Sequence, residues 1–253
     1  MMKADKERIP EQEPKAENET YNYERFRIGL YEIDPLTGPR TGEKAPDFAA
    51  ETVDGHKVHL SNYLGHPVVL IIGSYTSPQY IDKIETMNRI LYRHPEAMFL
   101  TLYVREAHPG NKVPPHRNSK DKRALAQRAI TEDGEKAEVL LDDLEGSAHQ
   151  KYGGLPNMSY VIDEQGTVVV REAWNNPQLV EKALDRLRRG ESPGNIRAGF
   201  VPVSPLTVLR VLDRAGRDAL GDVLISLPTL LAKHFSASVK EIRRPIAQRR
   251  SRT

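Results

Sequence analysis

A continuously apolar stretch, Val68-Val69-Leu70-Ile71-Ile72-Gly73, constrains the fold of this chain more than any other feature. It lacks the alternation of polar and apolar residues that marks a half-exposed strand, so it predicts a strand covered on both faces. Apolar residues at helical spacing follow from about 78 to 94, and a second apolar run occupies 98–104. Two buried strands joined by a helix pair in parallel through a right-handed crossover, which predicts a βαβ unit.

Weaker patterns predict the elements on either side of this unit. They indicate a hairpin of 48–53 and 56–60, a helix at 120–130, a short strand at 139–142, a hairpin of 158–163 and 167–171, and a helix at 177–189. This order is typical of an α/β fold in which a mixed central sheet carries helices on both faces.

Composition divides the chain into four regions. Residues 1–20 contain almost no apolar side chains and are expected to form a disordered leader, while 21–41 are expected to pack along the domain edge. Residues 42–190 carry the predicted sheet and its helices. Residues 191–253 hold 11 Lys and Arg against 5 acids, which predicts a basic extension.

The extension also has helical spacing of apolar residues. A helix is expected from about 205 to 226, interrupted by Pro228, with a second short helix to about 242. The end of the chain, from Lys233 to Arg252, carries seven Lys and Arg against the single acid Glu241. Such a tail is either a solvated charged end or a site for an acidic partner, a nucleic acid or an anionic membrane surface. Self-association into a homodimer is a further alternative for the helix that precedes it.

Whole-chain composition excludes several functions. The 253 residues have a formal net charge of only +2, so no specific nucleic-acid binding is expected from the chain as a whole. They contain no cysteine, which excludes disulfides, thiolate metal sites and thiol redox chemistry. The N-terminus shows no secretory signal, and no window approaches 18 apolar residues, so a cytoplasmic protein is expected.

The chemistry is expected where the first buried strand ends. There Gly73-Ser74-Tyr75-Thr76-Ser77-Pro78 connects the strand to a predicted helix N-terminus. In redox proteins this geometry activates a thiol, because the free amides and the helix dipole stabilise an anion. Ser77 stands at the position of that nucleophile.

The same residues carry a resemblance to a known family. The segment from Gly73 to Tyr80 resembles the active-site motif of the iodothyronine deiodinases, a thioredoxin-fold family with selenocysteine or cysteine where Ser77 stands. Four further segments are similar to parts of that family: Tyr103 to Pro109 with its Glu-Ala-His sequence, His116-Arg117, the proline loop Leu155-Pro156, and Trp174-Asn175-Asn176-Pro177. The resemblance covers about 42 to 187.

The resemblance implies a fold, a reaction and a site. The fold would be thioredoxin-like, and the reaction would be reductive removal of iodine from an aromatic ring, or another thiol or selenol reaction with a peroxide. An active member would need a thiol reductant, and no bound cofactor is implied. The implied catalytic group is Ser77 at the nucleophile position with Glu106, His108 and His116, and the implied substrate-binding group is Tyr75, Thr76, Pro156 and Trp174.

Ser77 conflicts with that implied reaction. A serine hydroxyl is far less acidic than a thiol and has no reversible oxidation states, so it cannot form the sulfenyl, selenenyl or disulfide species of the redox cycle. We therefore expect a fold and pocket retained without the redox step, in a protein that binds a small molecule or a partner. The first alternative is an oxidoreductase whose position 77 is natively selenocysteine or cysteine, with the serine an engineered replacement.

Three readings of the same residues remain open. Ser77 before Pro78 is suited to be a helix N-cap. It could instead be a hydroxyl nucleophile with His108 as base and Glu106 orienting the base, although the Gly-x-Ser-x-Gly elbow is absent. Glu106, His108 and His116 could also bind a metal, but their spacing matches no specific ligand pattern. A last alternative places the function in the basic extension, with the domain as a scaffold.

Overall fold

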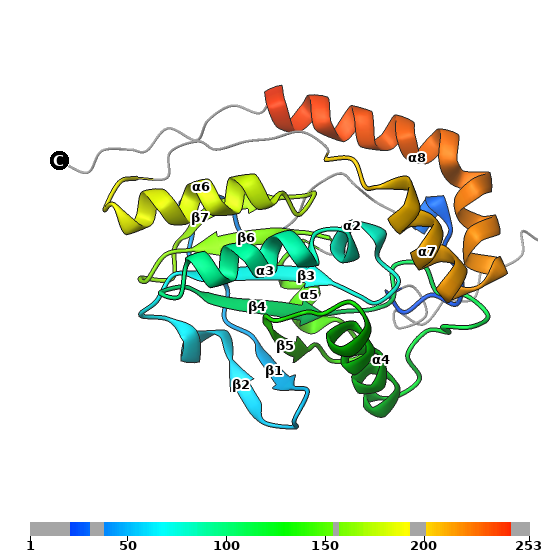
Figure 1. The fold of residues 1–253 in the computed structure, drawn as a ribbon, viewed down its shortest axis with the longest axis horizontal. Coiled ribbons are helices and arrows are strands. Elements are labelled where there is room, and N and C mark those ends of the chain that lie inside the picture. The colour runs from blue at the N-terminus through cyan, green and yellow to red at the C-terminus, as the bar shows by residue number, and fades with distance from the viewer. Residues whose placement is uncertain (1–20, 31–37, 154–156, 193–200, 244–253) are drawn as a thin grey trace, which may run out of the picture.

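The computed structural model describes residues 21–30, 38–153, 157–192 and 201–243 (Figure 1). Within these residues a seven-stranded sheet has the order β2-β1-β5-β4-β3-β6-β7. The strands are β1 (Ala49–Thr52), β2 (Lys57–His59), β3 (Val68–Gly73), β4 (Met98–Tyr103), β5 (Glu138–Leu141), β6 (Ser159–Ile162) and β7 (Val168–Glu172). The central strand β3 is buried along its whole length and pairs parallel to β4 and antiparallel to β6.

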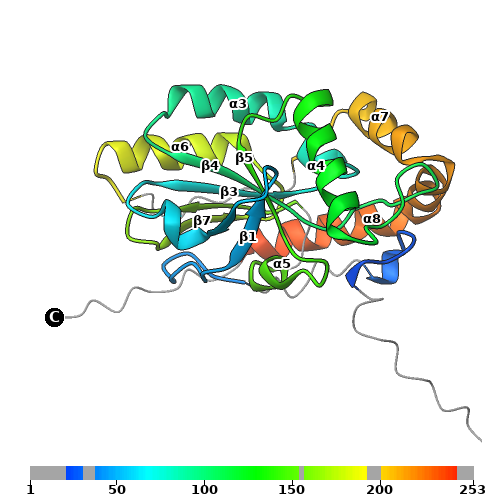
Figure 2. The same cartoon turned by 90° about the horizontal axis from the view of Figure 1, so that it is seen from below.

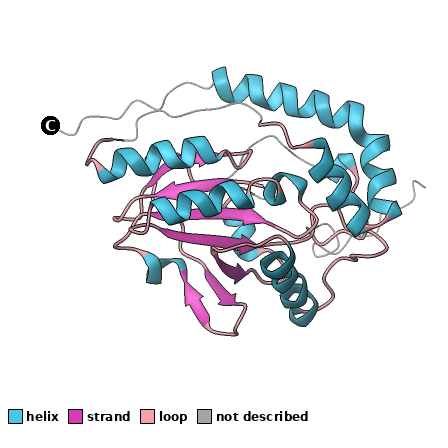
Figure 3. Cartoon of the chain, in the orientation of Figure 1, coloured by secondary structure: helices cyan, strands magenta, loops and turns pink. Residues whose placement is uncertain are grey.

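Helices cover both faces of this sheet, as the sequence predicts (Figures 2 and 3). One face, with Val69, Ile71, Phe99 and Val161, packs against the helices α2 (Pro78–Ile81), α3 (Ile84–Arg93) and α6 (Pro177–Arg188). The helix α4 (Ser119–Glu132) packs on the same face beside β5. The other face packs against α5 (Ser147–Lys151), the 3-10 turn η2 (Leu60–Tyr63) and the chain around Phe48. Another 3-10 turn, η1 (Ile28–Leu30), precedes the sheet.

The expected elements differ from the observed ones at two places in the domain. The helix expected over 78–94 is divided into α2 and α3 at Asp82-Lys83, where the Lys83 ammonium bonds the Asp82 carboxylate at 2.6 Å and the Pro202 carbonyl at 3.2 Å. The C-terminal region therefore contacts the helix at its break. The five-residue helix α5 was not predicted, because one turn of helix is too short to show a periodic pattern.

The C-terminal helices end at other residues than expected. The structure has α7 (Pro205–Ala215) and α8 (Arg217–Arg243), and Pro228 lies inside α8. Our prediction that Pro228 ends the helix was wrong, because the break falls at Gly216, whose φ of +118° suits only glycine. Pro228 costs α8 one hydrogen bond to the carbonyl of Leu224, and both residues are exposed, so water can satisfy that carbonyl.

The helices α7 and α8 are packed onto the domain near the carboxyl end of β3. Val211 joins the core formed by α2 and α3, and a separate cluster joins Leu212, Ala215, Ala219 and Val223 to Tyr23 and Phe26. The Ala215 carbonyl accepts hydrogen bonds from the amides of Lys112 and Val113 at 3.0 and 3.2 Å. The loop after β4 and the N-terminal segment 21–30 are thus both fixed against the extension.

Gly110 tests how tightly this region is packed. A Cβ at Gly110 would lie 2.6 Å from the Ala215 carbonyl oxygen, whereas a Cβ at Gly221 would have no atom within 4 Å. We expect Gly110→Ala to lower the free energy of unfolding by about 1–3 kcal/mol through overpacking. Gly221→Ala in α8 should raise it by up to about 1 kcal/mol through helix propensity. Urea unfolding followed by circular dichroism measures both, and equal effects of the two variants would contradict the tight docking of α7.

Candidate functional site

The loop that carries the motif begins at a close contact between Gly73 and Tyr80. A Cβ at Gly73 would lie 2.4 Å from the Tyr80 ring, so only glycine allows this ring to pack over the end of β3. The Tyr80 hydroxyl donates to Glu135 at 2.6 Å, which fixes the ring at its far side. The chain therefore passes from β3 into α2 within a few residues, as the motif predicts.

Ser77 caps the helix α2. Its hydroxyl accepts a hydrogen bond from the Tyr80 amide at 3.4 Å, and Pro78 occupies the first helical position. Ser77 is 3% exposed, so the hydroxyl is enclosed by protein. This confirms the N-cap role expected for a serine before proline.

A fully buried carboxylate, Glu106, lies beside this loop just after β4. Its Oε2 accepts the amide and the hydroxyl of Thr76 at 2.8 and 2.6 Å. Its Oε1 accepts the Tyr103 hydroxyl at 2.5 Å and the His116 Nε2 at 3.0 Å. Glu106 therefore connects the motif loop, the end of β4 and the loop before α4.

The charge of Glu106 is stabilised by these donors. Burial alone would raise the pKa of this carboxyl, but the hydrogen bond and charge of His116, with the hydroxyls of Thr76 and Tyr103, hold the pKa below its usual value. The carboxylate thus stays ionised and acts as an acceptor. This arrangement fixes the position of Thr76, the neighbour of Ser77.

The position of His108 differs from the one expected if it were the base for a Ser77 nucleophile oriented by Glu106. Its amide donates to the Thr76 hydroxyl at 3.1 Å, and its ring lies 4.6 Å from the ring of Phe26. Its Nδ1 is buried without a hydrogen-bond partner among the described residues. The interpretation of Glu106 as the orienter of His108 was wrong, because the Glu106 carboxylate bonds His116 instead.

Trp174 lies on the loop before α6 and contacts a residue that sequence reasoning missed. The Trp174 carbonyl accepts Gln79 Nε2 at 2.6 Å, which places it beside α2. Its ring lies 4.7 Å from the ring of His234 on α8. Burial lowers the pKa of both His234 and His108 to about 4, and His234 also disfavours the charged form of His108. No motif surrounds His234, so only the packing of α8 could have indicated its role.

The two remaining predicted residues give less support for a ligand pocket. The Tyr75 ring is fully buried between the guanidinium groups of Arg128 and Arg214, at 4.6 and 3.7 Å from the ring centroid. Its hydroxyl donates to Glu132, so its contacts are with α4 and α7. Pro156 lies outside the described residues.

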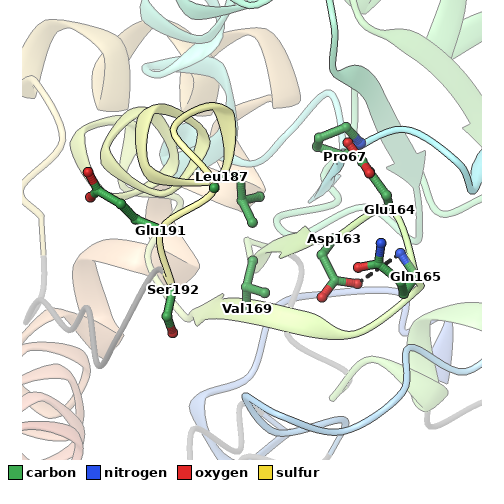
Figure 4. A pocket seen from close by; sticks show the side chains of 9 residues that line it. Pro67, Asp163, Glu164, Gln165, Val169, Leu187, Glu191 and Ser192 are labelled. Carbon is green, nitrogen blue, oxygen red and sulfur yellow. Dashed lines mark hydrogen bonds between the residues drawn. The ribbon is translucent and has the colours of Figure 1, made fainter.

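A pocket of about 290 Å³ lies between the turn after β6 and the end of α6 (Figure 4), and Pro67 at the start of β3 places it at the opposite end of the sheet from the motif. Pro67, which precedes β3, and Asp163, which follows β6, both line it. The Asp163 carboxylate accepts a hydrogen bond from the Gln165 amide at 3.1 Å, so it also stabilises the turn between β6 and β7.

Among the described residues no group of three or more His, Asp or Glu side chains is placed to hold a metal ion. No described helix is both long and apolar enough to cross a membrane.

Comparison with known sequences settles the family. Residues 15–177 match the sequence model of the iodothyronine deiodinases. The chain belongs to the iodothyronine deiodinase family. It is 28% identical over 134 residues to the type I iodothyronine deiodinase of Xenopus laevis, which covers 49% of this chain and 53% of that protein. The chain thus spans about half the length of this curated relative.

Solved structures agree with the fold of this deiodinase-family chain. A hypothetical protein of Sinorhizobium meliloti superposes with a TM-score of 0.51 at 13% identity, over 65% of this chain and 93% of its own. The thioredoxin domain of a thiol-disulfide oxidoreductase of Bacteroides vulgatus gives 0.46 at 17% identity, over 56% and 96%. The mixed seven-stranded sheet with helices on both faces, together with membership of the family, identifies the fold as α/β and thioredoxin-like, as the resemblance implied, with a helical C-terminal region added.

Removing the charge of Glu106 should destabilise this deiodinase-family fold. In Glu106→Gln an NH2 group replaces one buried carboxylate oxygen and points at groups that themselves donate hydrogen bonds. We therefore expect the free energy of unfolding to fall by about 2–4 kcal/mol. Urea denaturation measures it. The control Glu85→Gln removes an exposed carboxylate paired with Arg89, and should change the free energy by less than about 0.5 kcal/mol. If Glu106→Gln lowers the free energy of unfolding no more than the control does, the stabilising role of the bonds to Glu106 is contradicted.

His108 should make the fold sensitive to acid. Its pKa is about 4 in the folded chain and 6.5 as the ordinary value, so below pH 6.5 the unfolded state binds a proton that the folded state does not. Stability is therefore lost as pH falls from 6.5 towards 4, by up to about 1.4 kcal/mol per pH unit. As pH falls over this range, the stability of His108→Gln should rise relative to that of the chain with His108. The exposed control His66→Gln should show no such shift, and a pH-independent difference for His108→Gln would contradict the assignment.

Proposed function

We propose that this chain is a redox-silent member of the deiodinase family that keeps the family's pocket for binding a small aromatic molecule or a partner. The observation that carries the proposal is Ser77, which occupies the redox position as a helix cap in a chain without cysteine. Neither a serine hydroxyl nor any other side chain of these 253 residues can pass through thiol or selenol oxidation states. The family's reaction therefore has no electron-pair donor of the required kind here.

The surroundings of Ser77 support retention of a binding pocket. Trp174 and the imidazoles of His108 and His234 gather near this end of the sheet, and burial keeps both imidazoles neutral at pH 7. A neutral, aromatic wall suits an uncharged aromatic ligand. The buried Nδ1 of His108 has no partner among the described residues, so it offers an acceptor or donor to a ligand hydroxyl.

Family membership supports a second candidate, an oxidoreductase with selenocysteine or cysteine natively at position 77. The loop geometry is compatible with this, because Glu106 is bonded to Thr76, Tyr103 and His116. Reading the codon for position 77 in the natural gene distinguishes the two candidates directly. A serine codon supports the redox-silent protein, and a TGA or cysteine codon supports the oxidoreductase.

A single substitution separates loss of the nucleophile from loss of the pocket. We expect no thiol-dependent turnover of an iodinated phenol or of a hydroperoxide by the chain with Ser77, and measurable turnover of at least one of them by Ser77→Cys. The reason is that a thiol at a helix N-terminus has a lowered pKa and can complete the redox cycle. Turnover is measured as iodide release and as peroxide consumption with dithiothreitol as reductant.

The controls keep this result interpretable. Ser192→Cys places one thiol at an exposed position remote from the motif, and should remain inactive. Binding of the same iodinated phenol to the natural chain is measured by calorimetry. Turnover by the natural chain contradicts a redox-silent protein. Absence of binding by the natural chain, together with inactivity of Ser77→Cys, contradicts a retained pocket.

A further inference from the structure

The helix α8 has one face packed on the domain. Val223 and Ser226 are buried, and Leu230 and His234 are half-buried, at spacings of three and four residues. At the two ends of this stripe Asp222 pairs with Arg25 at 2.6 Å and His234 contacts Trp174. The helix is therefore held in one orientation, and its opposite face points away from the domain.

The outer face of α8 is apolar over about three turns. We define it by the exposed residues Leu224, Ile225, Leu227, Pro228, Leu231, Ala232 and Phe235. Ile225 is 83% exposed and Phe235 is 74% exposed, so most of the surface of these large residues faces the solvent. The segment 223–232 contains no charged residue. Exposed apolar patches of this extent mark an interaction site, because water solvates them poorly.

The chain that continues from the outer face is strongly basic. From Lys233 to Thr253 it carries seven Lys and Arg, whereas Glu241 is the single acid. Five of the cations are arginines at 243–252, where the sequence has no acid. An apolar helix face followed by clustered cations is typical of segments that lie on an anionic bilayer, with the helix in the interface and the cations at the headgroups.

We propose that the outer face of α8 and the basic segment after it bind an anionic lipid surface. The apolar side chains enter the boundary between headgroups and acyl chains, and the arginines pair with lipid phosphates and carboxylates. The helix lies on the bilayer and does not cross it, since no described helix is apolar enough over a spanning length. This inference is independent of Ser77 and of the proposed function.

Charge complementarity favours lipid over a second copy of the chain. Two parallel copies of α8 would bring two basic segments together, with seven cations against one acid in each. Antiparallel copies would set a basic segment against the start of α8, where the acids are only Asp218 and Asp222, and Asp222 is already paired with Arg25. A nucleic acid would pair with the arginines but would leave the apolar face in water. An anionic bilayer satisfies both features.

Vesicle binding tests the proposal on the full chain. We expect the chain to sediment with vesicles of phosphatidylcholine containing 30% phosphatidylserine, and to remain in solution with phosphatidylcholine alone. Ile225→Glu with Phe235→Glu should weaken binding at least about tenfold, because two carboxylates oppose both the apolar and the electrostatic contribution. Arg249→Gln with Arg250→Gln should weaken it about fivefold for each charge removed, and 0.5 M salt should weaken it similarly.

A matched control and a second readout complete the test. Tyr92 on α3 is 68% exposed and lies outside the extension, so Tyr92→Glu should leave vesicle binding unchanged. Because the chain has no cysteine, Phe235→Cys accepts a single environment-sensitive dye, whose emission should shift to the blue with anionic vesicles. The same dye at Tyr92→Cys should not respond.

Three results would overturn the proposal. The first is absence of binding to phosphatidylserine vesicles by the natural chain. The second is binding that Ile225→Glu with Phe235→Glu retains in full, which would assign it to the cations alone. The third is a stable dimer, measured by light scattering, that this double variant dissociates while vesicles are not bound, which would assign the outer face to a second copy.

Discussion

The buried carboxylate of Glu106 determines how the loops at the carboxyl ends of β3 and β4 are arranged. A fully buried charge is costly unless several donors satisfy it, and here the donors come from Thr76, Tyr103 and His116. Three segments that are separate in the sequence must therefore meet at one point. The position of the motif loop, and with it the start of α2, depends on this meeting.

This constraint also bears on Ser77, the neighbour of Thr76 in the motif loop. Thr76 makes both bonds from the motif loop to Glu106, and the Ser77 hydroxyl accepts the Tyr80 amide as the cap of α2. Thr76, which fixes the loop, is thus a different residue from Ser77, which aligns with the family's selenocysteine or cysteine. A different side chain at position 77 leaves the bonds between Thr76 and Glu106 intact, so the fold tolerates a change at this position.

Local signals made the sheet predictable, but long-range contacts decided the site. The apolar run at 68–73 and the turn residues of the hairpins gave the strands to within one or two residues, because burial and turn geometry act over short stretches. The pairing of Glu106 with His116 in place of His108 depends on how the loop before α4 folds back. His234 approaches Trp174 from 60 residues away, through the docking of α8, and no local pattern encodes that contact.

The helix α8 lies between the loop that carries Trp174 and the surface of the molecule. Its packed face sets His234 against Trp174, and its outer face presents Ile225 and Phe235 to the solvent. A ligand that displaces His234 from Trp174 must shift the helix or its side chains, and a surface that holds the outer face restricts that shift. Two binding events that act on one element share a coupling free energy and influence each other reciprocally. The C-terminal region, which lies beyond the residues matched to the deiodinase family, therefore adds to the thioredoxin-like domain a helix that contacts Trp174 with one face and presents an apolar face to the solvent.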